Sequence, residues 1–228
     1  GGLGIDYNMV PFRQSGGENI DDCNIDGSLS GQELYHRFKH TLFDRIEQYI
    51  DGVKKTLKKY ARYKDLAIVC EPGRSVVGYA GILLSRVLFV KQRRTELQEK
   101  DFVIIDSSMS ELIRPVLYGG QHPIVLLKTA GELDEQRKVA DIVGPVCESG
   151  DFLGKKRKIC GVRRGDLMVI CHCGAYGMSM SSNYNSRPLV TELLIDNLNH
   201  VRLIKSKQDI DCLFKDEKRL LKLLQCKL

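Results

Sequence analysis

Cys70-Glu71-Pro72-Gly73-Arg74 follows an apolar run, Leu66 to Val69, and that run predicts a short buried strand. The Pro-Gly pair then ends the strand at once, so a carboxylate and a guanidinium lie three residues apart on a sharp turn. In parallel α/β sheets and barrels, ligands bind at this carboxyl end of the strands. A solvated ion pair on a strand-to-loop turn is the competing interpretation, so the other stretches of the chain must decide.

The segment before this strand has the periodicity of a helix. From about residue 32 to residue 60, apolar side chains recur at spacings of three and four: Leu34, Phe38, Leu42, Ile46, Tyr49 and Val53. Residues 8–31 are polar and predict a loop. The chain opens with Gly1-Gly2-Leu3-Gly4-Ile5, where glycines would let backbone N–H groups approach a phosphate, although a flexible terminus is the alternative. Residues 1–78 are therefore predicted to be a piece of an α/β domain.

The pattern changes after Arg74. Short β-rich runs alternate with turn-like or charged stretches: Gly78–Val90, Phe102–Ile105, Pro123–Leu127, Asp141–Val146, Leu167–Cys171 and Glu192–Ile195. An all-β domain over residues 79–205 is expected, which makes the fold class α+β. A final helix, about Asp209 to Gln225, is expected to pack its apolar face on the body of the protein, with a partner-binding helix as the alternative.

Composition limits the class of protein. The 228 residues are 43% hydrophobic and 28% charged, with a net charge of +6, which suits one large domain or two small ones. The basic run Lys155–Lys158 lacks interleaved aromatics and lies between glycines, so we interpret it as a solvated turn and expect no nucleic-acid partner. No apolar run reaches the ~18 residues of a membrane span, so no membrane is expected.

The eight cysteines are scattered along a chain long enough to build a core, which favours free thiols in a reducing compartment. Cys171-His172-Cys173 has a metal-like composition. Alternate residues of a strand point to opposite faces, however, so His172 could not join the two thiols at one zinc ion, and no metal site is expected.

Three further stretches carry more chemistry than a plain fold needs: Asp106–Tyr118 (DSSMSELIRPVLY), Gly144–Asp151 (GPVCESGD) and Gly174–Asn185 (GAYGMSMSSNYN). Together with the glycine-rich opening and the Glu-Pro-Gly-Arg turn, they resemble the diaminopimelate decarboxylases. These belong to the alanine-racemase-like enzymes that depend on pyridoxal 5′-phosphate (PLP). The five motifs occur in the family's order, from residue 1 to about residue 205.

The resemblance implies a (β/α)8 barrel followed by a β domain. Residues 1–78 would be the last barrel units with their phosphate-binding loops, residues 79–205 the β domain and residues 206–228 the C-terminal helix. It also implies a homodimer with active sites at the subunit interface, a small amino acid as substrate, and a cytoplasmic enzyme, or a plastid enzyme if a transit peptide preceded Gly1.

The motif matches imply roles for single residues. The PLP phosphate would be held by Gly1, Gly2, Glu71, Pro72, Gly73, Arg74 and Tyr176. Arg74, Arg114 and Tyr118 would bind the distal carboxylate of the substrate, since a guanidinium matches a carboxylate through two hydrogen bonds. Glu148 would pair with the distal ammonium, with Tyr176 also at the substrate. Cys147 would return a proton to the carbon that loses CO2.

Each of these residues also has a structural alternative. Arg114 and Tyr118 could cap a strand or pair with surface acids, Cys147 could be a small buried side chain, and Tyr176 could mark a turn between glycines.

The implied activity is decarboxylation of meso-2,6-diaminopimelate to L-lysine and CO2. One alternative is a decarboxylase of ornithine or arginine, but a substrate that ends in an ammonium group would favour an acid where Arg114 and Tyr118 stand. Another alternative is a non-catalytic relative that binds a partner, because no lysine here matches the family's Schiff-base motif. The chain is expected to be inactive alone, as part of a longer protein. His172 stands where the family usually has Asp.

Overall fold

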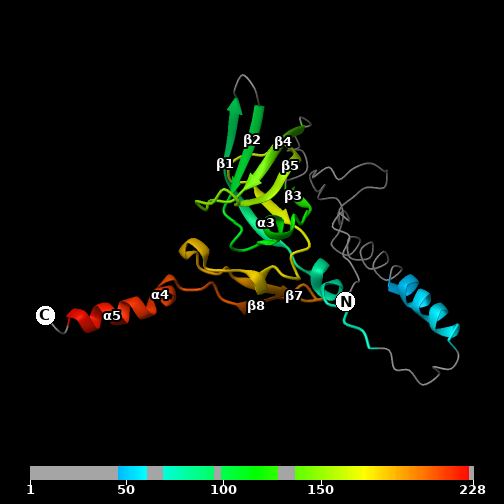
Figure 1. Cartoon of the computed structure of the whole chain (residues 1–228). Coiled ribbons are helices and arrows are strands. Elements are labelled where there is room, and N and C mark those ends of the chain that lie inside the picture. Colours follow the sequence, from blue (N-terminus) through cyan, green and yellow to red (C-terminus); the bar gives the residue numbers. More distant parts are fainter. Residues whose placement is uncertain (1–45, 61–68, 95–98, 128–136, 226–228) are drawn as a thin grey trace.

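The computed structural model describes residues 46–60, 69–94, 99–127 and 137–225 (Figure 1). Residues 46–58 are helical, in agreement with the described part of the helix expected from residue 32. Gly1, Gly2 and most of the strand predicted before Cys70 lie outside the described residues. Val69, the one described residue of that strand, is not in a strand and is 88% exposed, because this segment lies away from both sheets.

A curled, mixed sheet of six strands forms the body of the molecule, in the order β3-β6-β1-β2-β4-β5. Its strands are β1 (Leu83–Arg94), β2 (Glu99–Ile105), β3 (Ile124–Leu127), β4 (Arg137–Val143), β5 (Phe152–Cys160) and β6 (Leu167–Ile170). Only the β2–β4 pair is parallel among these described strands. The long β1 pairs with two strands: Leu83–Arg86 pair with β6 and Val87–Arg94 with β2, with an irregularity between Val87 and Phe89 close to where the partner changes.

The core lies inside this curled sheet. Alternation along β2 places Val103 and Ile105 inside with no exposed surface, while Phe102 and Ile104 are partly exposed. Other strands add fully buried side chains to the same cluster: Val87, Ile124, Leu126, Ile142, Leu153, Met168 and Ile170. Burial of each such side chain contributes about 1.5–3 kcal/mol, so the sheet is stabilised by its own interior.

The basic run at Lys155–Lys158 lies in strand β5 and is not the solvated turn that the sequence suggested. Lys155, Lys156 and Lys158 are exposed, and Arg157 is half-buried. A strand with one solvated face can carry a row of lysines, and this explains the incorrect expectation. The neighbouring run predicted for Asp141–Val146 ends as a strand at Val143, because Gly144-Pro145 breaks the ladder.

Short helical turns lie between the strands, at or next to several of the predicted site residues. They are α2 (Arg74–Val77), η2 (Gly78–Ala80), α3 (Arg114–Tyr118), η3 (Met178–Met180) and η4 (Tyr184–Ser186). The strand expected from Gly78 therefore begins only at Leu83. The η2 segment meets the loop after β6 through two glycines: a Cβ on Gly81 would lie 2.4 Å from the Gly174 Cα, and one on Gly174 would lie 1.9 Å from the Val77 oxygen.

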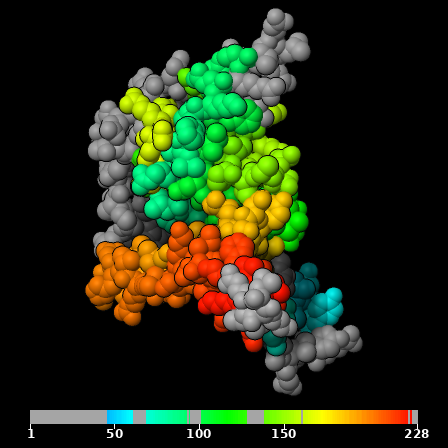
Figure 2. Space-filling model, turned by 90° about the vertical axis from the view of Figure 1, so that its left-hand side faces the viewer, coloured from blue at the N-terminus to red at the C-terminus, as the bar shows by residue number. Residues whose placement is uncertain are grey.

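The C-terminal part has a second sheet of two strands, β7 (Glu192–Ile195) and β8 (Val201–Lys205), followed by α4 (Ile210–Leu213) and α5 (Lys215–Gln225). The side chain of Asp209 caps α4 by accepting the Asp211 N–H. Figure 2 shows this part as an orange-to-red band beside the six-stranded sheet. No helix among the described residues is long and apolar enough to cross a membrane.

The expectation that the last helix packs its apolar face on the body is wrong for this chain. Leu220, Leu221 and Leu224 are 61%, 58% and 61% exposed. In Figure 1, α4 and α5 point away from the six-stranded sheet, so the sheet offers these side chains no surface to pack against.

Candidate active site

Arg114 lies at the centre of a cluster that unites three of the predicted site residues. The side chain is buried, and its guanidinium carbon lies 5.5 Å from the centroid of the Tyr118 ring and 5.7 Å from that of Tyr176. Both distances are in the range of cation–π contacts. The tyrosines are 62% and 44% exposed, so the buried cation lies beneath two rings that face solvent.

Local sequence explains how these side chains are presented. Pro115 in the first turn favours the start of α3 at Arg114, and Gly119 ends it in the left-handed conformation at φ +62°. A Cβ on Gly177 would lie 2.3 Å from the Cys173 oxygen, so only glycine allows the tight turn that carries Tyr176. Tyr176 itself has φ +61°, an uncommon conformation for a bulky residue.

A buried histidine connects Arg114 with two other arginines. His122 has no exposed surface, and its Nδ1 lies 2.9 Å from the Cys171 carbonyl oxygen. The pKa of His122 is lowered to about 4, chiefly by burial and also by the cations of Arg114, Arg157 and Arg74, against the opposing hydrogen bond to Cys171. Arg74, predicted to share a carboxylate with Arg114, is thus within electrostatic range of the same imidazole.

Glu148 and Cys147 lie together on the exposed loop after β4. The Gly150 N–H donates to Glu148 Oε1 at 3.0 Å, and the Tyr184 hydroxyl donates to Oε2 at 3.1 Å. These hydrogen bonds lower the pKa of the Glu148 carboxyl, while the carboxylate raises the pKa of Tyr184. Sequence reasoning assigned no role to Tyr184, although it belongs to a stretch singled out for its composition. Cys147 is exposed, which excludes the buried-thiol alternative.

The three motif stretches, with the last one extended to Arg187, form one loop cluster, defined here as residues 106–118, 144–151 and 174–187. The buried carboxylate of Asp151 accepts the N–H groups of Met109 at 2.7 Å and Val146 at 2.8 Å, and so joins two of them. Burial raises the pKa of Asp151. The third stretch is joined by an ion pair, in which Arg187 Nη2 lies 3.3 Å from Glu111 Oε1. Sequence reasoning gave no role to these three charged residues.

The match to a known family covers the first two of these three loops. Residues 50–174, more than half of the chain, match the model of the pyridoxal-dependent decarboxylase C-terminal sheet domain. The chain belongs to this family. The resemblance expected from the motifs is therefore confirmed, and the curled sheet is the family's C-terminal sheet domain.

Relatives in this decarboxylase family are similar over much of the chain. A diaminopimelate decarboxylase of Zymomonas mobilis is 34% identical over 94% of this chain and 47% of its own length. One of Neisseria meningitidis serogroup B is 45% identical over 69% of this chain and 36% of its own length. The chain spans less than half the length of these curated relatives.

Solved structures agree with this assignment. Diaminopimelate decarboxylase from Helicobacter pylori, complexed with L-lysine, has a TM-score of 0.64 at 37% identity, over 75% of this chain and 39% of that one. The enzyme from M. jannaschii, also complexed with L-lysine, has a TM-score of 0.63 at 33% identity, over 72% of this chain and 36% of that one.

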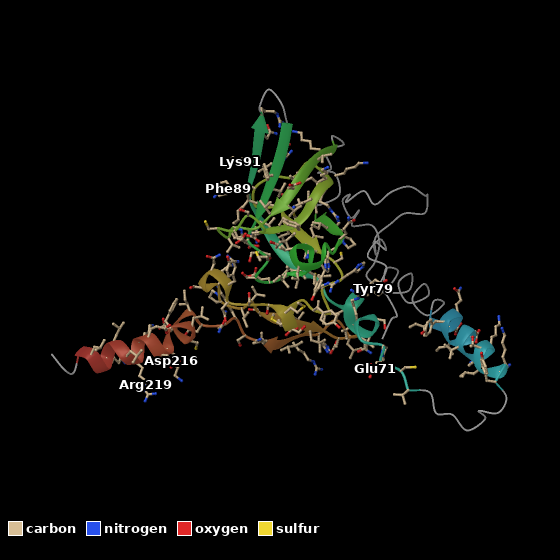
Figure 3. The ribbon with its side chains drawn as sticks, in the orientation of Figure 1. Glu71, Tyr79, Phe89, Lys91, Asp216 and Arg219 are labelled. Carbon is tan, nitrogen blue, oxygen red and sulfur yellow. The ribbon has the colours of Figure 1, made fainter. Side chains whose placement is uncertain are left out.

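The Glu71–Arg74 turn, which the sequence predicts to bind a cofactor phosphate, is open on one side. Gly73 has φ +53°, and a Cβ on it would meet only the Glu71 oxygen, at 3.9 Å. Glu71, Pro72 and Gly73 are exposed, and Figure 3 shows Glu71 away from the sheet interior. An accessible glycine turn fits a phosphate that binds backbone N–H groups. Gly1 and Gly2, the other half of this predicted site, lie outside the described residues.

His172, which stands where the family usually has Asp, is buried against Tyr79. Their ring centroids lie 4.7 Å apart in an edge-on arrangement, and His172 has φ +61°. The sulfur of Cys173 donates to the Ile170 carbonyl at 3.2 Å, and burial raises the pKa of this thiol. Within the described ranges, no group of three His, Cys, Asp or Glu side chains could hold a metal ion. The cysteines at 70, 147, 171, 173 and 212 are free thiols, as expected.

Proposed function

We propose that this chain is the C-terminal part of a PLP-dependent enzyme that decarboxylates meso-2,6-diaminopimelate to L-lysine and CO2. The observation that carries the proposal is the buried Arg114 guanidinium between Tyr118 and Tyr176. The names of the relatives, and the L-lysine in two of the solved structures, support the same substrate and product.

The proposed role of Arg114 is to bind the distal carboxylate of the substrate, together with Arg74 and the Tyr118 hydroxyl. A guanidinium offers two parallel N–H donors to a carboxylate, and burial strengthens these charge-assisted bonds. Glu148 would bind the distal ammonium, because the Gly150 and Tyr184 hydrogen bonds keep its carboxylate ionised and oriented. These two groups would select a substrate whose far end is an amino acid.

Bound PLP would supply the electron sink that accepts the electron pair left when the carboxylate departs as CO2. The Glu71–Arg74 turn and Tyr176 would hold its phosphate, with Gly1 and Gly2 as the second proposed loop. Cys147 would donate the proton to the carbon that has lost CO2, since its thiol is exposed on the same loop as Glu148.

The domain organisation that we propose follows from the relatives' greater length. Residues 1–78 would be the last units of a (β/α)8 barrel, residues 79–205 the sheet domain, and residues 206–228 the C-terminal helix. The active sites would lie at the interface of a homodimer, because Cys147 and Glu148 protrude on an exposed loop that a second subunit can reach.

The test is an assay of the full-length protein, reconstituted with PLP, on meso-diaminopimelate and on ornithine. Decarboxylation of diaminopimelate with little turnover of ornithine is expected. Arg114→Ala should lower kcat/KM for diaminopimelate by about 100-fold, because a buried carboxylate would lose its charged partner.

Arg164→Ala is the matched control. Arg164 is an exposed arginine whose guanidinium carbon lies 4.9 Å above the Phe89 ring, on the part of β1 remote from Glu71 and Tyr79 (Figure 3). This variant should keep wild-type activity. An unchanged kcat/KM in Arg114→Ala would show that Arg114 does not bind the distal carboxylate. A full-length protein that neither binds PLP nor releases CO2 would favour the non-catalytic alternative.

A further inference from the structure

Arg157 differs from the other members of the basic run on β5. Lys156 and Lys158 are exposed, and the Lys155 ammonium lies 3.8 Å above the Phe152 ring. Arg157 is half-buried, and its Nη2 donates to the backbone oxygen of His122 at 2.7 Å. This one cation of the run therefore points toward the interior, where the chain enters β3.

A bulge in β5 gives Arg157 this direction. Ala140 pairs with Arg157 and Ile142 pairs with Gly154, so β5 holds one more residue than β4 between these two pairs. The bulge is fixed at Lys156, which has φ +52° and donates its N–H to Asp141 Oδ1 at 2.8 Å.

Gly154 makes the room that the Arg157 side chain occupies. A Cβ on Gly154 would lie 2.9 Å from both the Arg157 Cγ and the Ile124 Cδ1. Any larger residue there would displace the arginine or the core side chain, so the position of Arg157 depends on this glycine.

The hydrogen bond from Arg157 fixes the backbone of His122. Its ring is fixed on the other side, because a carbonyl oxygen only accepts and Nδ1 must therefore donate its proton to the Cys171 oxygen. In the neutral ring, Nε2 then carries a lone pair. The charged groups that act on this imidazole are Arg74 from α2, Arg114 from α3 and Arg157 from β5, and they favour the neutral ring that can lie among three cations.

We propose that Arg157 and His122 are positioning residues that hold the Arg114 guanidinium beneath Tyr118 and Tyr176, so that Arg114 is pre-organised for the distal carboxylate. Neither residue is proposed to touch the substrate. Arg157 fixes the His122 backbone at 2.7 Å. Helix α3, which begins at Arg114, packs against β5, and the Gly120 N–H, two residues before His122, donates to the Arg114 carbonyl oxygen at 3.2 Å, so a fixed His122 also fixes the helix that carries Arg114. The inference builds on the proposed function by adding residues that support its carboxylate site.

The kinetic test compares Arg157→Gln with Lys158→Gln, its exposed neighbour on the same strand, in the full-length enzyme with PLP. Arg157→Gln should raise KM for diaminopimelate about 10-fold, with kcat changed less than about twofold, because misplacement of a binding group weakens substrate binding. Arg157→Lys should restore part of the loss, and Lys158→Gln should behave as wild type. Equal KM values for Arg157→Gln and Lys158→Gln would overturn the proposal.

A crystal structure of Arg157→Gln and of His122→Asn separates this inference from the proposed function. Asn can still donate to the Cys171 oxygen, so the fold should be kept. The Arg114 guanidinium should leave its place between the two tyrosine rings. If it stays there in both variants, the positioning role is wrong, whatever the enzyme decarboxylates. A wild-type protein inactive on diaminopimelate would overturn the function alone.

Discussion

The six-stranded sheet and the C-terminal segment, residues 192–225, differ in how far their apolar side chains are exposed to solvent. In the sheet, Ile142 and Met168 have no exposed surface, whereas in the hairpin and helices Leu203 and Leu221 are 61% and 58% exposed. The sheet is thus stabilised by its own core. The C-terminal segment presents an apolar surface of the kind that proteins cover with another domain or subunit. The loop cluster with Arg114 belongs to the six-stranded sheet, the region with a buried core.

The largest expected effect tests this contrast with one truncation in each region. In the 228-residue chain, Ile142→Ala should lower the free energy of unfolding by about 2–5 kcal/mol, because it leaves a cavity in a closed core. Leu203→Ala should change it by less than about 0.5 kcal/mol. Urea unfolding measures both. Similar losses of stability for the two variants would contradict the difference between the two regions. A loss in Leu203→Ala that appears only in the full-length protein would show that another part of that protein covers Leu203.

A second pair compares carboxylates. Asp151→Ala should cost about 2–4 kcal/mol, because the N–H groups of Met109 and Val146 lose their acceptor inside the loop cluster. Asp211→Ala, which removes an exposed ion pair with Lys218 on the C-terminal helices, should cost less than about 1 kcal/mol. Amide hydrogen exchange at Met109 and Val146 reports the loss locally. Unchanged protection in Asp151→Ala would show that other contacts hold the loops together.

Acid should destabilise the six-stranded sheet through His122. Its pKa is about 4 in the folded protein against 6.5 for the free group, so the unfolded chain binds the proton more strongly between these values. Stability from the neutral ring is therefore complete above pH 6.5 and is lost as the pH falls toward 4, by about 2–3 kcal/mol. Thermal unfolding of wild type and His122→Asn across this range isolates the effect, and parallel curves would contradict it.

The smallest effect is expected at the exposed edge of the loop cluster. Tyr184→Phe removes one hydrogen bond to Glu148, so the pKa of that carboxyl should rise toward its ordinary value while stability changes by less than about 0.5 kcal/mol. A titration of the Glu148 carboxyl carbon by NMR measures the shift, with Tyr118→Phe as the control. An unchanged pKa would mean that the Gly150 N–H alone sets it.

Much of the sheet could be predicted because its strands obey simple patterns. The predicted runs that end at Ile105 and Leu127 are β2 and β3, and the run that begins at Leu167 is β6. In the second sheet, the predicted run Glu192–Ile195 is β7 with the same bounds. Strand β5 was missed because its polar face dominates its composition. The strand predicted from Gly78 begins only at Leu83, because Gly78–Ala80 continue the helical turn of Arg74–Val77, where local bonds such as Ser75 Oγ to the Pro72 oxygen at 2.7 Å form.

Contacts between site residues could be predicted from the sequence where both residues lie on one helix. Contacts between residues on different loops or strands could not. Arg114 and Tyr118 are four residues apart on one helix, so their contact follows from helical spacing. The pairing of Glu148 with Tyr184 joins loops 36 residues apart, and the inward turn of Arg157 depends on a bulge. Neither leaves a periodic signal, because both depend on how the strands are ordered in the sheet.

The contact between Gly81 and Gly174 affects how inherited variation in this chain should be interpreted. A methyl group at either position would push the segment that follows Arg74 away from the turn that carries Tyr176. An alanine there would separate these two segments without altering any charged or hydroxyl group of the loop cluster.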